Sequence, residues 1–436
     1  MPVAFVSTRG APPTSLGEAL LAGLAPDGGL FVPSELPRLE PRDFADCDNC
    51  VATAQVFMAP FVAGTPLQSE LADIVAETYA FPIPLVSLGA DAPQVLELFH
   101  GPTAAFKDVG ARFLAACMAR LATIDPAHPM TILVATSGDT GGAVAAAFFD
   151  RPGFDVAVLY PSGRVSARQQ QQLTCWGGNV FAFEVAGNFD ACQRLVKAAF
   201  ADPALAERFR LSSANSINIG RLLPQSVYYA NAALQHYRAT GRKLSFIVPT
   251  GNLGNGLAAV LARAVGLPIG DVVLATNANK TIPDYLASGR YEARDSLATL
   301  ASAMDVGNPS NMERLRYLFG EADELTQQVR AIAVGDAEIQ ATVRHVAEEY
   351  GMPICPHTAT GFHAWQRLPA TERRGVDWAI AATAHPAKFD DIVEPLLGAS
   401  VPIPSALAAL LDRPAHALAI PAELSALQHG LESRGR

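Results

Sequence analysis

Two segments of the chain combine glycines with small polar residues in a pattern that suits anion binding. Residues 249–256 read Pro-Thr-Gly-Asn-Leu-Gly-Asn-Gly, and residues 136–142 read Thr-Ser-Gly-Asp-Thr-Gly-Gly. Glycines let backbone amides approach a ligand closely, and a helix that follows such a loop favours negative charge at its first turn. The 249–256 loop lacks the lysine of a Walker loop and the glycine spacing of a dinucleotide fingerprint. It suits a compact phosphomonoester, whereas 136–142 could equally be a tight turn with a helix cap.

Lys107 is a candidate nucleophile because of its place in the chain. It follows a turn at Gly101 and Pro102 and precedes a predicted helix over 108–121. A helix N-terminus disfavours a cation, so this position lowers the pKa of an ammonium group and favours the free amine that forms imines. A solvated surface charge is the common alternative for any single lysine.

Polar residues ahead of another predicted helix indicate a second anion site. Residues 215–221 read Asn-Ser-Ile-Asn-Ile-Gly-Arg and precede a predicted helix over 222–237. Arg221 could bind an oxyanion through two hydrogen bonds, although a capped helix start with a surface arginine is the alternative. Thr383 follows a predicted strand, where its hydroxyl group could contact a ligand ring atom or bond to its own backbone.

These polar segments follow short apolar runs that alternate with helix-like stretches. The runs lie at 131–135, 156–160, 244–248, 272–275 and 378–382. Continuous apolar strands between helices predict parallel sheets covered on both faces, and ligands bind beyond the carboxyl ends of such strands. We expect two doubly wound, mostly parallel α/β domains, at 85–240 and 241–436, after a small N-terminal cap domain at 1–84.

The composition restricts the class of protein. The chain has 436 residues, half of them apolar, and a net charge of −10, which favours a large folded core and argues against nucleic-acid binding. It has no apolar run of about 18 residues and no leader with a cleavage site, so we expect a cytoplasmic protein without membrane association. Cys47 and Cys50 form a single Cys-x-x-Cys without a second ligand pair, so we expect reduced thiols and no metal.

Taken together, the motifs are similar to those of one enzyme family. The chain resembles the threonine synthases, which are fold-type II enzymes of the tryptophan-synthase β-like superfamily and depend on pyridoxal 5′-phosphate (PLP). The segments that carry the resemblance are STRG at 7–10, DGGLFVP at 27–33, HGPTAAFKD at 100–108, ATSGDTG at 135–141, NSINIGR at 215–221, PTGNLGN at 249–255, ATNAN at 275–279, SAMDVGNPSN at 302–311 and TAHPAKF at 383–389. They span nearly the whole chain, and no single one of them would be specific.

The resemblance implies roles for individual residues. Lys107 matches the family's Schiff-base lysine, and Thr383 matches the hydroxyl residue that faces the pyridine nitrogen. The loop that binds the PLP phosphate matches Gly251, Asn252, Leu253, Gly254 and Asn255. The positions around the substrate's carboxylate and phosphate match Ser137, Thr140, Asn215, Ser216 and Arg221.

Asp139 departs from the wider superfamily, in which many members carry an asparagine that contacts the 3′ oxygen of PLP. It remains among the expected cofactor contacts. A carboxylate beside a phenolate is repulsive, so we expect the Asp139 side chain either to turn away from the cofactor or to be protonated.

The resemblance also implies a reaction, with PLP bound between the two α/β domains. O-phospho-L-homoserine would lose phosphate by γ-elimination and gain water at Cβ to give L-threonine, while Lys107 moves the Cα proton. Two alternatives stay open, namely a PLP-dependent lyase that releases 2-oxobutyrate and a non-catalytic phosphometabolite-binding protein. A serine or threonine dehydratase would need no second phosphate site, so the 215–221 cluster argues against it. We expect a monomer or a homodimer.

Overall fold

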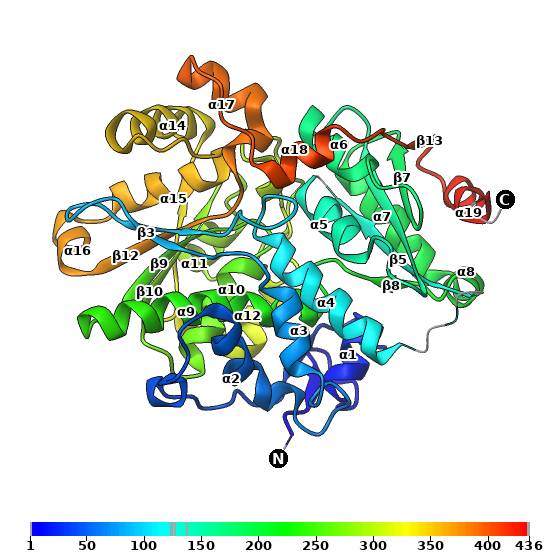
Figure 1. Ribbon diagram of the computed structural model, residues 1–436, viewed down its shortest axis with the longest axis horizontal. Coiled ribbons are helices and arrows are strands. Elements are labelled where there is room, and N and C mark those ends of the chain that lie inside the picture. The colour runs from blue at the N-terminus through cyan, green and yellow to red at the C-terminus, as the bar shows by residue number, and fades with distance from the viewer. Residues whose placement is uncertain (1, 123–124, 126–127, 137, 434–436) are drawn as a thin grey trace.

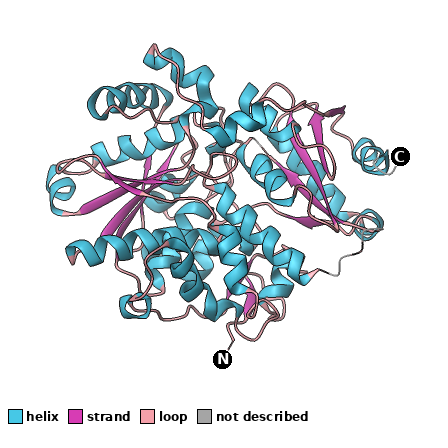
Figure 2. Cartoon of the chain, viewed as in Figure 1, coloured by secondary structure: helices cyan, strands magenta, loops and turns pink. Residues whose placement is uncertain are grey.

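The computed structural model describes residues 2–122, 125, 128–136 and 138–433. Two β-sheets stand apart from each other, with helices between and around them (Figures 1 and 2). A smaller group of elements at the N-terminus lies below both sheets in this view. The arrangement matches the expected mixed α/β architecture with mostly parallel sheets.

The larger sheet has six strands in the order β11-β10-β9-β12-β4-β3. Their bounds in that order are Arg330–Ala333, Ile269–Thr276, Leu244–Pro249, Asp377–Ala382, Gln94–Glu97 and Leu85–Ser87. All neighbours are parallel except β3 and β4, which are antiparallel. Every residue of β9 is buried, as a strand covered on both faces requires.

The smaller sheet has five parallel strands in the order β13-β7-β6-β5-β8. Their bounds in that order are Leu418–Ile420, Val180–Val185, Phe154–Pro161, Met130–Ala135 and Ser212–Ser213. The predicted strands at 131–135 and 156–160 are thus neighbours in this sheet.

The strands of the two larger sheets are not divided at residue 240, where a boundary between the α/β domains was predicted. Strands β3 and β4 come from the predicted 85–240 segment but join the sheet built by later strands, through the pairing of β4 with β12. Strand β13 returns from the C-terminal part to the smaller sheet. The order of apolar runs along a sequence does not determine which strands pair, so these exchanges were not predictable from it.

Helices cover both faces of the larger sheet. Phe246 and Val248 of β9 pack into the core that contains α9 (Leu223–Thr240) and α10 (Gly254–Ala264). Ile247 faces the opposite core, with α15 (Pro356–Arg367) and α14 (Asp336–Tyr350). Figure 1 shows these two layers below and above the sheet. The alternation along β9 is the period of two that a strand imposes.

The remaining helices are divided between the two sheets. Helix α4 (Lys107–Leu121) packs against α5 (Asp139–Phe148) and α9 between the sheets. The others are α6 (Ala167–Thr174), α7 (Phe189–Ala201), α8 (Pro203–Arg208), α11 (Thr281–Ser288), α12 (Met312–Phe319), α13 (Ala322–Leu325), α16 (Ala370–Gly375), α17 (Asp390–Leu397), α18 (Ser405–Leu411) and α19 (Leu424–Glu432). Of these, α6 and α7 lie on the smaller sheet, and α11 and α16 lie on the larger one. Four 3₁₀ turns are η1 (Pro41–Phe44), η2 (Ile219–Arg221), η3 (Ser302–Met304) and η4 (Pro386–Phe389).

The N-terminal elements share a core with the rest of the chain. Strands β1 (Phe5–Ser7) and β2 (Phe31–Pro33) form an antiparallel pair, and three helices follow, α1 (Leu16–Ala22), α2 (Cys50–Val62) and α3 (Leu71–Thr78). Helix α2 packs on α9, with a buried hydrogen bond of 3.1 Å from Thr53 to Asn231. The cap is therefore anchored directly to the helices that line the centre of the molecule.

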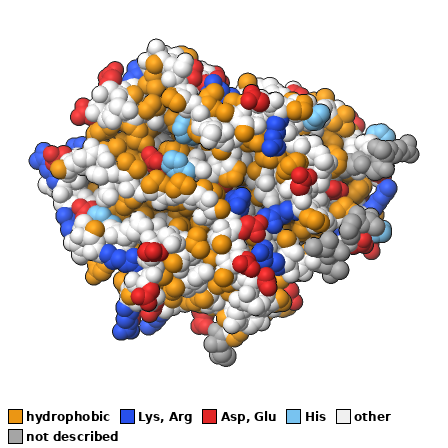
Figure 3. All heavy atoms as spheres, viewed as in Figure 1, with side chains coloured by type: hydrophobic (Ala, Val, Ile, Leu, Met, Phe, Trp, Pro, Cys, Tyr) orange, Lys and Arg blue, Asp and Glu red, His pale blue; other side chains and the backbone are white. Residues whose placement is uncertain are grey.

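Acidic and basic side chains are interspersed over the face of the molecule shown in Figure 3. Hydrophobic side chains reach the surface between them in small groups. No single sign of charge dominates that face.

Candidate active site

A pocket of about 1380 Å³ is lined by the segments that were predicted from the sequence to bind ligands. Its lining includes the loops after β5, β9 and β12, the start of α4 and the 215–221 segment, together with parts of the N-terminal region, of α7 and of residues 291–321. Every predicted site residue that the structure describes lies on its wall, namely Lys107, Asp139, Thr140, Asn215, Ser216, Arg221, Gly251, Asn252, Leu253, Gly254, Asn255 and Thr383. Ser137, the remaining prediction, lies outside the described residues.

Lys107 is the first residue of α4, one position earlier than the predicted helix start. The backbone amide of Phe106 donates to the carbonyl of Thr383 at 2.9 Å, and Ala105 forms a β-bridge with Ala384. The lysine is therefore fastened to the end of β12. Burial lowers the pKa of Lys107 to about 8, against the opposing charge of Asp139. At that pKa a useful fraction of the side chain is free amine near neutral pH.

The loop between β9 and α10 presents a row of unpaired backbone amides. In the described part of the chain, the amides of residues 251–256 donate to no other group. Leu253 has a left-handed conformation with φ of 65°, which turns the chain into the first turn of α10. A Cβ at Gly251 would lie 2.6 Å from the Cα atom of Met304. This close approach and these free amides are what a phosphate cradle requires.

Two side chains of this loop have structural partners that the sequence did not reveal. Asn252 accepts hydrogen bonds from the amide and hydroxyl of Ser310 at 2.6 and 2.9 Å, so its side chain fastens the loop. Asn255 accepts from the hydroxyls of Tyr228 and Tyr229 at 2.6 and 2.8 Å. These tyrosines, both buried on α9, were missed because nothing in their local sequence marks them.

Four buried polar atoms on the pocket wall have no hydrogen-bond partner among the described residues. They are Arg221 Nε, Thr250 Oγ1, Asn255 Nδ2 and His357 Nδ1. An unpartnered buried donor costs about 1–3 kcal/mol, so four of them around one pocket point to a polar ligand. The wall therefore fits a phosphate-bearing cofactor.

The 215–221 segment contributes one strongly buried cation. Arg221 is 3% exposed, and one of its terminal nitrogens donates to the carbonyl of Ala214. Burial lowers the pKa of Arg221 to about 10, and the charge of Asp108 opposes that shift. Asn215 donates to the carbonyl of Ala135 at 3.0 Å, which ties the segment to the end of β5. This geometry excludes the alternative of a surface arginine.

Asp139 lines the pocket, and its carboxylate has a partner of opposite charge that the expectation did not include. Its carboxylate lies 2.9 Å from the ammonium group of Lys388, a residue in η4 that sequence reasoning did not select. Burial alone would raise the pKa of Asp139, but the charges of Lys388 and Lys107 keep it well below its ordinary value. Lys388 lies far from Asp139 along the chain, so no local sequence pattern predicted this pair.

His357 is a further residue that the sequence reasoning missed. It lies in the first turn of α15, is 3% exposed, and its Nε2 atom accepts the amide of Ala303 at 3.0 Å. Burial lowers the pKa of His357 to about 4. The ring is therefore neutral at ordinary pH and carries its proton on Nδ1, the atom that has no partner.

Thr383 stands directly after β12 and is 4% exposed. Its hydroxyl group has no hydrogen-bond partner among the described residues, while its carbonyl accepts the amide of Phe106. The hydroxyl is therefore free to meet a ligand on the pocket wall.

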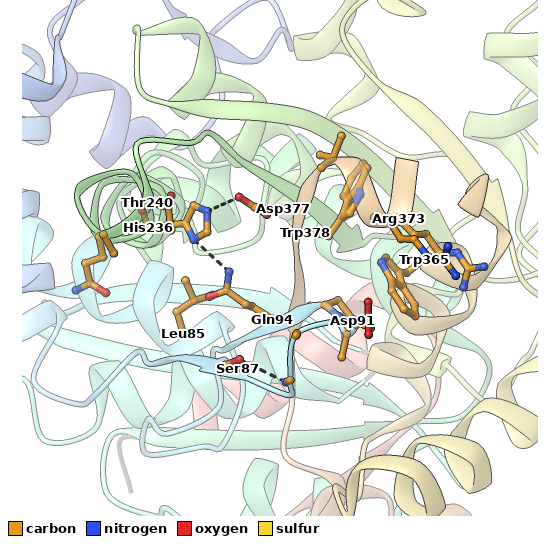
Figure 4. Close-up of a pocket in the computed structure, with 18 residues that line it drawn as sticks. Leu85, Ser87, Asp91, Gln94, His236, Thr240, Trp365, Arg373, Asp377 and Trp378 are labelled. Atoms are coloured by element: carbon orange, nitrogen blue, oxygen red, sulfur yellow. Dashed lines mark hydrogen bonds and ion pairs between the residues drawn. The ribbon is translucent and has the colours of Figure 1, made fainter. Parts of the chain in front are cut away.

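A second, smaller cavity of about 550 Å³ lies at the edge of the larger sheet (Figure 4). There His236 bonds to Gln94 at 3.2 Å and to Asp377 at 3.0 Å, while Arg373 lies over the ring of Trp365. None of the predicted site residues lines this cavity. We therefore take the larger pocket as the candidate active site.

Comparisons with known proteins agree with this geometry. A family model described as pyridoxal-phosphate dependent enzyme matches residues 79–378, which contain Lys107 and the 251–255 loop. Models of the threonine synthase N terminus and of its C-terminal region match residues 4–79 and 358–429. The fold and the site thus define a PLP-dependent enzyme.

Full-length relatives make the family more specific. Threonine synthase of Escherichia coli is 39% identical over 95% of both chains, and that of Serratia marcescens is 38% identical over the same shares. The crystal structure of the Escherichia coli enzyme superposes with a TM-score of 0.90 at 37% identity, covering 99% of this chain and 100% of that one. A PLP-bound threonine synthase from Brucella melitensis gives the same TM-score at 36% identity, with the same coverage. The chain belongs to the threonine synthase family, as the motifs predicted.

Proposed function

We propose that the chain converts O-phospho-L-homoserine and water into L-threonine and inorganic phosphate, with PLP as its cofactor. One observation carries this proposal. A single pocket is lined by a lysine whose pKa is lowered to about 8, by a row of unpaired backbone amides and by a buried arginine. These are a base, a cradle for the cofactor phosphate and a binding group for a second anion, which are the parts that this reaction needs.

The residues that would hold PLP follow from the wall of the pocket. The amides of Gly251, Asn252, Leu253, Gly254 and Asn255 would bind its phosphate, and Lys107 would anchor its carbonyl carbon. The free hydroxyl of Thr383 would face the ring nitrogen, and Asp139 would lie beside the ring. When bound, PLP supplies an electron sink for negative charge that develops at the substrate's carbon atoms.

Lys107 would also move protons. Once it is released from the cofactor, its amine can take a proton from Cα and return one later, and a pKa near 8 suits both steps at neutral pH. Arg221 would hold an oxyanion of the substrate through Nε, which is buried and has no other partner. Asn215, Ser216 and Thr140 line the same wall and would orient the substrate, and we assign Ser137 to this group from the sequence alone.

The experiment that tests the proposal measures three products at once. The purified chain with PLP is given O-phospho-L-homoserine, and threonine, phosphate and 2-oxobutyrate are quantified. We expect threonine and phosphate in equal amounts. The Lys107→Ala variant should lose turnover, whereas Lys243→Ala, at an exposed position, should keep it.

Other outcomes would contradict the proposal in distinguishable ways. Phosphate accompanied by 2-oxobutyrate instead of threonine would identify a lyase that stops after elimination. A chain that releases no phosphate and stays colourless with added PLP would be a phosphometabolite-binding protein. Full activity in Lys107→Ala would refute the role of the lysine.

We further propose that the protein acts in the cytoplasm as a monomer or a homodimer, with O-phospho-L-homoserine as its substrate. Within the described residues, none of the helices combines the length and the apolar character needed to cross a bilayer. We keep the three-part division at 84 and 240 as a proposal for folding units, although strands are exchanged between the later two parts.

A further inference from the structure

A buried ion pair stands next to the candidate catalytic lysine. Lys388 is fully buried and Asp139 is 4% exposed, and their charged atoms are 2.9 Å apart. The ammonium of Lys388 also donates to the carbonyl of Thr103 at 2.7 Å, and Asp139 also accepts from Gln169 at 3.1 Å. Asp139 faces the pocket from α5, while Lys388 approaches it from η4.

Stability does not account for this pair. Removing two charges from water costs several kcal/mol per ion, and apolar residues of similar size often serve a fold as well or better. Asp139 also stands at the first turn of α5, where the helix dipole already favours a negative charge. Neutral residues could therefore fill both positions, which suggests that the charges have a function.

The charges around Lys107 suggest that function. The groups that act on it are Asp139, Arg221 and Lys388, and His357 faces the same cluster as a neutral ring. Asp139 alone would attract a proton to Lys107, because an anion stabilises a nearby ammonium group. Lys388 cancels that attraction, since the Asp139–Lys388 pair has no net charge.

We propose that Lys388 is the counter-ion of Asp139 and thereby keeps a useful fraction of Lys107 as free amine near neutral pH. Lys388 is thus a positioning residue that acts through Asp139. This inference rests on the proposed function only in that PLP forms its bond with Lys107. By pairing with Asp139, Lys388 would also reduce the repulsion between that carboxylate and an anionic oxygen of the cofactor.

The test follows the bond between Lys107 and PLP, without any substrate. The full-length chain is freed of cofactor and mixed with PLP from about pH 6 to about pH 10. The bond is trapped with borohydride at intervals, and the Lys107 peptide is quantified by mass spectrometry. Labelling of the exposed Lys243 in the same molecules is the internal control. We expect a midpoint near pH 8 for the unaltered chain.

Two single variants should move that midpoint in opposite directions. Lys388→Met leaves Asp139 unpaired, so the midpoint should rise by about one unit, and labelling near neutral pH should slow roughly tenfold. Asp139→Asn leaves the cation of Lys388 unpaired near Lys107, and two like charges repel, so the midpoint should fall. The double variant should lie between the two single variants, and Lys388→Arg should stay close to the unaltered chain. If Lys388→Met does not fold, the direction in Asp139→Asn still decides.

A purely structural role for Lys388, through its bond to Thr103, makes a different prediction. The variants would then lose stability, but their midpoints would stay unchanged, and that result would overturn the inference. If PLP forms no bond with Lys107 at any pH in the unaltered chain, the proposed function itself fails. The two failures are therefore distinguishable.

Discussion

Arg314 offers the sharpest test of how the pocket wall is supported. It is a fully buried side chain whose guanidinium donates to the carbonyls of Phe31 and Ser216 at 2.9 and 3.0 Å and to Asn311 at 2.7 Å. A fourth bond goes to the carbonyl of Ile217. Burial lowers the pKa of Arg314 to about 9. One cation thus joins β2, the 215–221 segment and the start of α12, and none of its four acceptors is an acid.

The Arg314→Met substitution keeps the length of the side chain but removes all four bonds. At about 1 kcal/mol net for each bond, the loss is ~4 kcal/mol. For a chain of 436 residues, with an unfolding entropy of about 2.1 cal/mol/K per residue, that corresponds to a fall of about 4 °C in Tm. Asn311 also donates to the carbonyl of Asn252 at 3.0 Å, so the affinity for PLP should fall as well.

Thermal unfolding followed by circular dichroism, with and without PLP, measures both effects. Arg290→Met is the matched control, because Arg290 pairs with Glu292 on the surface and its side chain is 80% exposed. That variant should change little, since exposed ion pairs contribute little to stability. Arg314→Lys should lie between, because it keeps the charge but not the four-bond geometry. A loss below about 1 kcal/mol in Arg314→Met would refute the reasoning.

Two further outcomes are expected. Gly251→Ala should weaken PLP binding roughly 5- to 150-fold, because its Cβ would lie 2.6 Å from the backbone of Met304 and overpacking costs ~1–3 kcal/mol. Gly375→Ala, where a Cβ meets nothing within 4 Å, is its control in a fluorescence titration, and equal affinities would contradict the close approach. His357 should remain neutral from pH 8 down to about 5, because its pKa is lowered to about 4. Its imidazole resonances in NMR should keep the neutral shifts, and a midpoint above pH 6 would contradict this.

The sequence predicted the elements of this fold well where the pattern is local. The strands expected at 244–248 and 378–382 are observed at 244–249 and 377–382. Helices α5 and α10 begin at Asp139 and Gly254, so the glycine-containing loops already form their first turns. The predicted pocket residues fall on one wall because all of them follow strand ends or precede helices.

What the sequence could not supply is the set of partners from distant parts of the chain. Lys388 was visible in a quoted motif, but only the fold brings it to Asp139. The sequence around Tyr228 and Tyr229 is that of an ordinary helix, and only the structure shows that both hydroxyls donate to Asn255. Hydrogen bonds of this kind depend on tertiary packing, and local periodicity predicts only secondary structure.

The pairing of β4 with β12 affects when the larger sheet can fold during protein synthesis. Strand β12 lies between β9 and β4. Strand β9 can pair with β10 and strand β4 with β3 before that, but each keeps one edge open until β12 has been synthesised. Until then their edges are open to other chains, and long-range parallel pairing closes slowly. The same late segment delivers Thr383 and Lys388 to the pocket. A nascent chain that is released early would carry Lys107 but could not yet assemble the surroundings that tune it.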